Sequence, residues 1–241
     1  YQKGLSNLHK CKDSSGVRIH KLAILEDLGS VFLYSGAFKK AENTLTQAKE
    51  IAESYFSTHP ASYFTYDRMA RVMSYIGKHD SALNYSQKVL DLRSTLYDKS
   101  HFRIGCSKIL QGSVLFSSGK TDDAIKYLLE SETLYKNNLT SNHCRFVFVY
   151  LILWRAFEDK LDYQNAKKYM NQTKKIALLH FEDNLNQIFA YQLNPSNPFS
   201  ILPNSAKNID YYLSALEVSK LLFFLTIEFG IWNKRHIFFN F

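Results

Sequence analysis

Hydrophobic and polar positions follow a helical period over most of the chain. Apolar residues recur every three or four positions, as at Leu22, Leu25 and Leu28, which places them on one face of a helix. This stretch stops at Gly36, where glycine tolerates the left-handed backbone that commonly ends a helix. A second periodic stretch follows at once. The pattern therefore predicts two helices joined by a tight turn.

The predicted hairpin recurs three more times along the chain. Four segments align on the alanines Ala41, Ala82, Ala124 and Ala166, at intervals of 41, 42 and 42 residues. Three histidines keep the same spacing, because each stands 23 residues before one of the repeat alanines Ala82, Ala124 and Ala166. These histidines are His59, His101 and His143. Since each hairpin alone exposes an apolar face, its stability requires stacking on its neighbours.

The repeated unit resembles the tetratricopeptide repeat. The small residue of that family's first helix matches Gly29, Ala70 and Gly112, and the alanine of its second helix matches the four alanines above. The fourth unit departs from the pattern, with Trp154 at the small position and Leu161 in place of the turn glycine. The spacing of about 42 residues is similar to the kinesin-light-chain type of repeat. The resemblance implies an all-α fold, a right-handed α-solenoid of helix hairpins.

Three segments of the chain are expected to differ in organisation. Residues 1–17 are polar and are predicted to be an irregular lead-in, whereas residues 18–181 hold the four repeats. Residues 182–241 are predicted to hold a loop with three of the four prolines, followed by a C-terminal capping helix over Ile209–Phe229.

Composition narrows the class of protein. The 241 residues include only 9 glycines and 4 prolines, which argues against a turn-rich β fold. The 3 cysteines are far apart and lack metal-ligand spacing, so a reducing, cytoplasmic location fits best. The start of the chain shows no apolar leader, and the longest apolar runs fall well short of the roughly 20 residues that span a bilayer. These features argue against membrane insertion.

The net charge of +8 leaves acidic partners possible. Six lysines lie in the second helices, which are expected to face outward: Lys39, Lys40, Lys167, Lys168, Lys174 and Lys175. They form no dense stripe of lysines interleaved with aromatic residues. A solvated face is therefore the better interpretation, and nucleic-acid binding is not predicted.

The sequence carries no recognisable catalytic motif. No metalloprotease, nucleotide-binding or nucleophile-elbow pattern is present. The periodic histidines would be separated by about a helix diameter, roughly 10 Å, whereas ligands of one metal ion lie about 2 Å from it. We therefore expect them at turns or helix starts, and we predict no enzyme activity, no cofactor and no metal site.

The functional surface is expected on the concave side of the array, which the first helices line in such folds. The candidate residues for binding a partner peptide there are Tyr34, Phe64, Asp67, Arg71, Tyr75, Phe116 and Arg155. Aromatic and arginine side chains are frequent interface anchors, and Arg71 and Arg155 are suited to acidic side chains of the partner. The competing interpretation is that some of these aromatics only pack between repeats. The Lys–Asn pair that clamps a chaperone C-terminus in some family members is missing.

The favoured hypothesis is a non-catalytic adaptor or scaffold for a partner protein or peptide. One alternative is a peptide-sensing regulatory domain. Another is the repeat portion of a larger multidomain protein, which the start at Tyr1 leaves open. An enzyme domain within the last 60 residues is disfavoured, because that segment is too short to build an active site alone.

Overall fold

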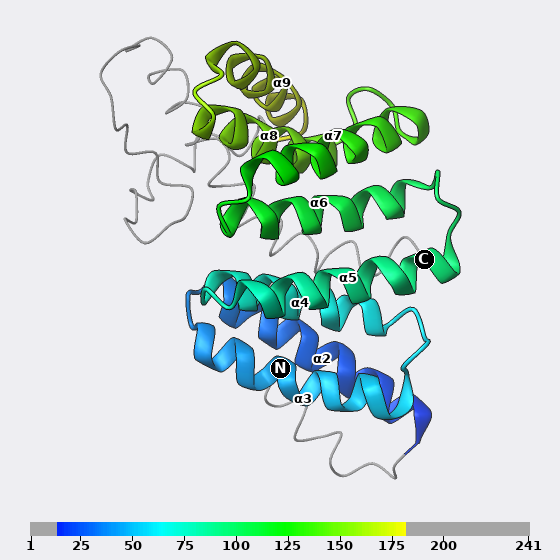
Figure 1. The fold of residues 1–241 in the computed structure, drawn as a ribbon. Coiled ribbons are helices and arrows are strands. Elements are labelled where there is room, and N and C mark those ends of the chain that lie inside the picture. The colour runs from blue at the N-terminus through cyan, green and yellow to red at the C-terminus, as the bar shows by residue number, and fades with distance from the viewer. Residues whose placement is uncertain (1–13, 182–241) are drawn as a thin grey trace. The chain divides into compact units, whose positions relative to one another are not determined.

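The computed structural model describes residues 14–181. Eight α-helices and no strand occupy this part of the chain, which confirms the all-α prediction (Figure 1). The helices are α2 (Ser15–Tyr34), α3 (Phe38–Tyr55), α4 (Ser62–Tyr75), α5 (His79–Leu96), α6 (Phe102–Ser117), α7 (Thr121–Asn138), α8 (Phe146–Asp159) and α9 (Tyr163–Phe181). They form four antiparallel hairpins, each with a first and a second helix.

The turn inside each hairpin has the same backbone geometry. Gly36, Gly77 and Gly119 have φ angles of 76°, 77° and 78°, in the left-handed region that glycine occupies without strain. In each turn, the backbone N–H of the glycine and the N–H of the residue after it donate to carbonyl oxygens of the preceding helix at 2.8–3.1 Å. These two bonds end the helix in a Schellman motif. Leu161 adopts a φ of 59° in the fourth turn and keeps both bonds.

The three periodic histidines lie one to three residues before the first helices of the next hairpins, α4, α6 and α8. The Nδ1 atoms of His59, His101 and His143 each accept the backbone N–H two residues later, at 3.1 Å. The histidine carbonyl also accepts the N–H three residues later, at 3.0–3.1 Å. Each ring thus satisfies a helix-terminal donor as a capping side chain does. The prediction that these histidines stand at turns or helix starts is confirmed.

The described residues up to Asn138 form one compact unit of three stacked hairpins. Each helix from α2 to α6 packs against the next one in the chain, and the first helices also pack against one another, α2 on α4 and α4 on α6 (Figure 1). The repeat alanines Ala41, Ala82 and Ala124 are fully buried. Their small side chains let the two helices of a hairpin approach closely.

Glycine is required where two of these hairpins close. A Cβ on Gly29 would lie 2.5 Å from Cγ of Leu45, and one on Gly112 would lie 2.7 Å from Cγ of Leu128. Cβ atoms do not approach other carbons this closely without displacing them. The small positions that the repeat pattern identified are therefore contact points between the first and second helices.

A second unit begins at Leu139, and its described part is the hairpin of α8 and α9. Trp154 stands at the small position of this repeat and is fully buried. On the second helix, Ala166 and Met170 are also buried, and Met170 occupies the register of Leu45 and Leu128. A flexible methionine suits this place, because its unbranched side chain adapts to an irregular gap.

The boundaries differ from the sequence prediction at the first helix. Ser14 accepts a hydrogen bond from Val17 N at 3.3 Å as the N-cap, so α2 begins inside the segment predicted as lead-in. Residues 1–13 and 182–241, with the predicted loop and capping helix, lie outside the described residues. Within residues 14–181, no helix is long and apolar enough to cross a membrane.

Candidate functional site

The candidate surface is the face shared by the first helices α2, α4 and α6. Helix α4 contacts both α2 and α6, and it therefore lies between them. We call this surface the first-helix face, defined by Glu26, Asp27, Ser30, Phe64, Asp67, Arg68, Arg71, Tyr75 and Phe116. It contains most of the residues predicted from the sequence.

Polar side chains join α2 to α4 across this face. Thr65 donates its hydroxyl to Glu26 at 2.5 Å, while Arg68 Nε donates to the Ser30 hydroxyl at 2.6 Å and Nη2 lies 3.7 Å from Asp27. Glu26 is only 6% exposed. Burial raises the pKa of Glu26, against the opposing effects of the Arg68 charge and the Thr65 hydrogen bond. These contacts fix the two helices in register.

Arg71 and Asp67 form an ion pair on α4 itself. Arg71 Nε lies 2.8 Å from Asp67 Oδ2, and the arginine side chain is 41% exposed. Burial favours the protonated acid, but the Arg71 charge and hydrogen bond, followed by the charges of Arg93 and Arg68, outweigh it and lower the pKa of Asp67. The guanidinium of Arg71 is thus already oriented by its own helix, and any acidic partner group must share it with Asp67.

The aromatic candidates differ in what they offer a partner. Phe64 is half-buried between the ring of Tyr63, with centroids 4.3 Å apart, and the guanidinium of Arg68 at 5.6 Å. Tyr75 is 40% exposed and stacks on Phe38 of α3, with centroids 5.6 Å apart. Phe116 on α6 is half-buried. The side chain of Tyr34, the last residue of α2, lies outside those described.

Arg155 belongs to the second unit, on helix α8. Its Nε lies 3.4 Å from Glu158, one turn further along the same helix. Both predicted arginines therefore pair with an acidic residue of their own helix, an arrangement that holds the side chain in place and reduces its net charge.

Sequence reasoning missed Arg68, which contacts both Ser30 and Asp27 of α2. It stands one position beyond the predicted inner residue Asp67, and its partners lie 38 residues away for Ser30 and on the same earlier helix for Asp27. The sequence signal that could have identified Arg68 is its separation of 38 residues from Ser30. Complementary polar residues slightly less than one repeat apart are candidates for contact between successive first helices.

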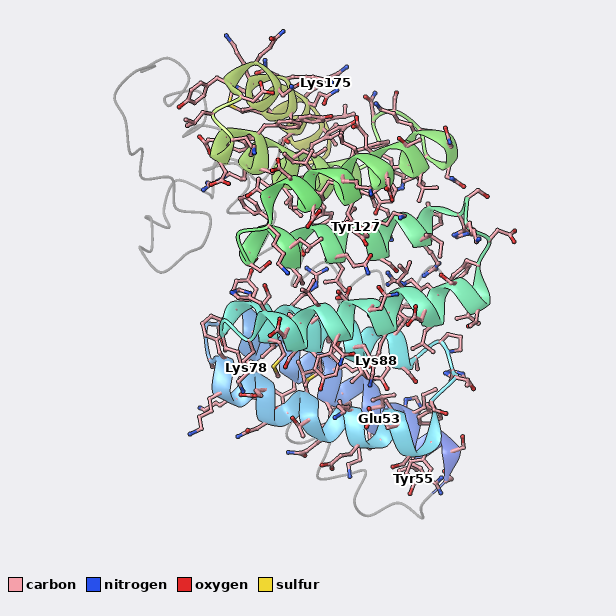
Figure 2. All side chains as sticks on the ribbon, viewed as in Figure 1. Glu53, Tyr55, Lys78, Lys88, Tyr127 and Lys175 are labelled. Atoms are coloured by element: carbon pink, nitrogen blue, oxygen red, sulfur yellow. The ribbon has the colours of Figure 1, made fainter. Side chains whose placement is uncertain are left out.

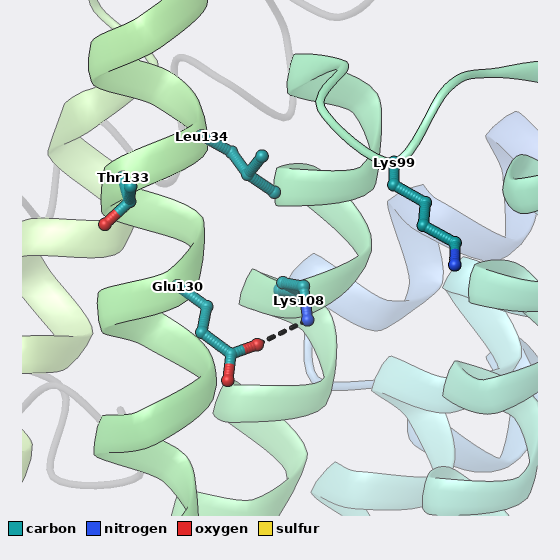
Figure 3. Close-up of a pocket in the computed structure, with 5 residues that line it drawn as sticks. All are labelled: Lys99, Lys108, Glu130, Thr133 and Leu134. Atoms are coloured by element: carbon teal, nitrogen blue, oxygen red, sulfur yellow. Dashed lines mark hydrogen bonds and ion pairs between the residues drawn. The ribbon is translucent and has the colours of Figure 1, made fainter.

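A separate depression lies between α6, α7 and the loop before α6. It has a volume of about 300 Å³ and is lined by Lys99, Lys108, Glu130, Thr133 and Leu134 (Figure 3). Lys108 Nζ is 2.5 Å from Glu130, so the two charges facing each other across the depression neutralise one another. No predicted site residue lines it.

The second helices carry ion pairs that neutralise part of their charge. Lys88 lies 3.7 Å from Glu53, and Lys78 lies 2.7 Å from Glu42, so both pairs link α5 or its N-cap to α3 (Figure 2). Next to the Lys88–Glu53 pair, burial of the Tyr66 hydroxyl and the charge of Glu53 raise the pKa of Tyr66 to about 12. The predicted outward lysines are exposed, apart from the half-buried Lys174.

The tetratricopeptide repeat family model matches residues 20–95, which span the first two hairpins. The likeness to the tetratricopeptide repeat therefore lies in the sequence of the first two hairpins. A comparison with curated protein sequences finds no match.

Two solved structures are similar in fold to most of the chain. BtubC (BKLC) from P. vanneervenii is 16% identical, with a TM-score of 0.60 over 86% of this chain and 78% of that chain. A variant of a Podosopora anserina protein, provisionally described as a kinesin light chain with nearly identical TPR-like repeats, is also 16% identical, with a TM-score of 0.57 over 90% of this chain and 98% of that chain. At this identity the likeness concerns the fold, and it agrees with the predicted kinesin-light-chain type of repeat.

Proposed function

We propose that this tetratricopeptide-repeat protein is a non-catalytic adaptor that binds a segment of a partner protein along the first-helix face. Tetratricopeptide repeats generally mediate interactions between proteins. The observation that carries the proposal is the arrangement on α4, where Arg71 and Tyr75 are about two-fifths exposed and lie one turn apart. Both residue types are frequent anchors of protein interfaces.

The polar contacts beneath these residues support the same proposal. Arg68 and Glu26 hold α4 against α2, and Asp67 orients the guanidinium of Arg71. A side chain that is already held in one orientation loses less conformational entropy when a partner binds. The first-helix face thus offers a rigid support with two accessible anchors, Arg71 and Tyr75.

Selection from a displayed peptide library against the full chain would test the proposal. For a selected peptide, we expect Tyr75→Ala and Arg71→Gln each to weaken binding by about tenfold, the loss typical of an interface anchor. Arg71→Gln is preferred to a charge reversal, because glutamate would face Asp67 and repel it.

Lys88→Gln, on the second helix α5, provides the matched control. It removes one exposed positive charge and one ion pair, as Arg71→Gln does, but at a place outside the first-helix face. Binding should change less than twofold with this variant. Equal weakening by all three substitutions, with folding intact by circular dichroism, would count against the first-helix face as the binding surface.

We also propose that the protein works in a reducing compartment such as the cytoplasm. The described Cys144 supports this location, because its thiol is not a disulfide partner. Fractionation of cells that express a tagged chain would test it, and recovery in the secreted fraction would contradict it.

A further inference from the structure

Two arginines enclose one buried tyrosine where α4, α5 and α6 meet. The guanidinium carbon of Arg93 lies 4.5 Å from the ring centroid of Tyr63, and Arg103 Nη1 donates to the Tyr63 hydroxyl oxygen at 3.1 Å. Tyr63 is 1% exposed and Arg93 is 6% exposed, whereas Arg103 is half-buried. We call Tyr63, Arg93 and Arg103 the arginine–tyrosine cluster.

The cluster has more hydrogen-bond donors than acceptors. Arg93 Nη1 donates to the Ser107 hydroxyl at 3.1 Å, but the buried Arg93 Nε has no acceptor among the described residues. The Tyr63 oxygen is used as an acceptor by Arg103, and its own O–H proton has no acceptor in the described part of the chain. A buried donor without an acceptor is unfavourable, so these groups favour a ligand that supplies acceptor oxygens.

The positive charge of the cluster is also poorly balanced. Within residues 14–181, neither Arg93 nor Arg103 forms an ion pair with a carboxylate. The acidic group that senses the Arg93 charge is Asp67, whose carboxylate already accepts a hydrogen bond from Arg71. Partly desolvated positive charges without a carboxylate partner are costly, and a bound anion would offset that cost.

Helix α6 adds to the positive potential. Arg103 is the second residue of this 16-residue helix, so its side chain stands at the positive end of the helix dipole. His101 caps the helix by accepting the Arg103 backbone N–H. The start of α6 therefore contributes positive electrostatic potential, but the backbone N–H of Arg103 is already bonded to His101. The side chain of Arg103 is the group that solvent and a ligand can reach directly.

We propose that the arginine–tyrosine cluster binds a phosphate group, with Arg103 in direct contact and Arg93 supporting it from beneath. Arginine presents several N–H donors in a plane that matches the oxygens of phosphate. The phosphate is either a free anion or the phosphorylated side chain of a partner. This inference does not depend on the proposed peptide binding, because inorganic phosphate alone serves as the probe.

The test is a titration of the full chain with sodium phosphate at constant ionic strength, followed by nitrogen–proton NMR. We expect saturable shifts centred on the amides from His101 to Ile104, with a Kd on the order of 1 mM for the free anion. Arg103→Gln should weaken phosphate binding by about fivefold or more, because it removes the direct contact.

Arg18→Gln is the matched control for charge and for stacking. The Arg18 guanidinium also lies over a tyrosine, 4.1 Å from the ring centroid of Tyr55, but outside the cluster. It should leave the Kd for phosphate unchanged. Equal weakening by Arg18→Gln and Arg103→Gln, or no saturable shift near His101 at about 50 mM phosphate, would overturn the proposal.

Two further arms complete the experiment. If Arg103→Gln does not fold, Tyr63→Phe removes the hydroxyl that accepts from Arg103 and whose proton is available to the phosphate; weaker phosphate binding by this variant supports the cluster, and an unchanged Kd overturns it. A phosphoserine peptide and its unphosphorylated form distinguish the sources of the phosphate. Binding of the phosphopeptide about tenfold tighter than free phosphate assigns a phosphorylated partner, and equal binding assigns the free anion.

Discussion

At the scale of single residues, the smallest side chains decide how closely the helices of a hairpin pack. Gly112 stands against Leu128, and the carbonyl of Ala124 would lie 3.3 Å from a Cβ added at Gly112. Leu128 and Ala124 are both fully buried, so neither can move without opening the core. The glycine is therefore kept for space rather than for backbone freedom.

The first prediction concerns Gly112→Ala. Alanine is the better helix former by about 1 kcal/mol, but overpacking against Leu128 costs typically about 1–3 kcal/mol. We therefore expect a lower free energy of unfolding, measured by urea denaturation. Gly16→Ala is the control, since its Cβ would meet only the Ser14 hydroxyl at 3.9 Å, and it should be neutral or stabilising. A stabilising Gly112→Ala would contradict the packing argument.

The second prediction concerns the fourth turn. Leu161 has a φ of 59° and is 69% exposed, so it bears the strain of a left-handed backbone while burying little apolar surface. Leu161→Gly should raise the free energy of unfolding by about 0.5–1 kcal/mol, after allowance for the greater freedom of glycine in the unfolded chain. Leu161→Ala keeps the strain and should give no gain. If both variants behave alike, the side chain rather than the backbone is responsible.

At the scale of elements, helices α2 and α4 carry two carboxyl groups, Glu26 and Asp67, whose pKa values shift in opposite directions. Burial raises the pKa of Glu26 above its ordinary value of 4.5, in spite of Arg68 and Thr65, and the charges of Asp27 and Asp67 raise it further. For Asp67, burial is outweighed by Arg71 and then by Arg93 and Arg68, and the pKa falls below 3.8. One carboxyl thus opposes the folded state when ionised, and the other supports it.

The third prediction uses this contrast. The folded protein binds the Glu26 proton more tightly than the unfolded chain does, so the contribution of Glu26 to stability is largest in acid. It declines as the pH rises from about 4.5 through the raised pKa. Glu26→Gln should remove this decline, and the advantage of the variant over the natural chain should grow toward neutral pH in urea denaturation.

Asp67→Asn is the control with the opposite sign. Its lowered pKa means that the ionised carboxylate stabilises the fold above about pH 3.8, and that this stability is lost as the pH falls through the folded value. The asparagine variant should therefore be weaker than the natural chain at neutral pH and approach it in acid. Parallel pH profiles for the two variants would show that burial does not govern Glu26.

The sequence predicted the helices and turns well, but it predicted the contacts between neighbouring hairpins poorly. Periodic apolar residues, the turn glycines and the repeat alanines depend on contacts within one hairpin, so their spacing alone located the helices. Arg68 was missed because its partners Ser30 and Asp27 lie on another hairpin. The orientation of neighbouring first helices, not local periodicity, decides whether Asp67 or Arg68 faces α2.

At the scale of the whole molecule, the unit up to Asn138 is a linear stack in which position along the stack sets stability. Helices α4 and α5 have a described hairpin on both sides, since α3 packs on α4 and α5 packs on α6. In such arrays stability is approximately the sum of each repeat and its interfaces with its neighbours. The second hairpin therefore has two interfaces.

The fourth prediction follows for native-state hydrogen exchange. Amides buried in α4 and α5 should exchange more slowly than those of α2 and α3, because opening the second hairpin breaks both interfaces. Mass spectrometry of peptic fragments would measure this. Equal or faster exchange in α4 and α5 would mean that the first hairpin is held by contacts beyond those described.

The sequence by itself determined that this chain folds into repeated helical hairpins, because backbone geometry and apolar period act over a few residues. It also located the turns at Gly36, Gly77 and Gly119. The tertiary structure decided which polar groups meet across hairpins, as Arg68 meets Ser30 and Arg103 meets Tyr63 over 38 and 40 residues. Those contacts depend on the stagger and rotation of stacked helices, which side-chain packing sets only when the hairpins come together.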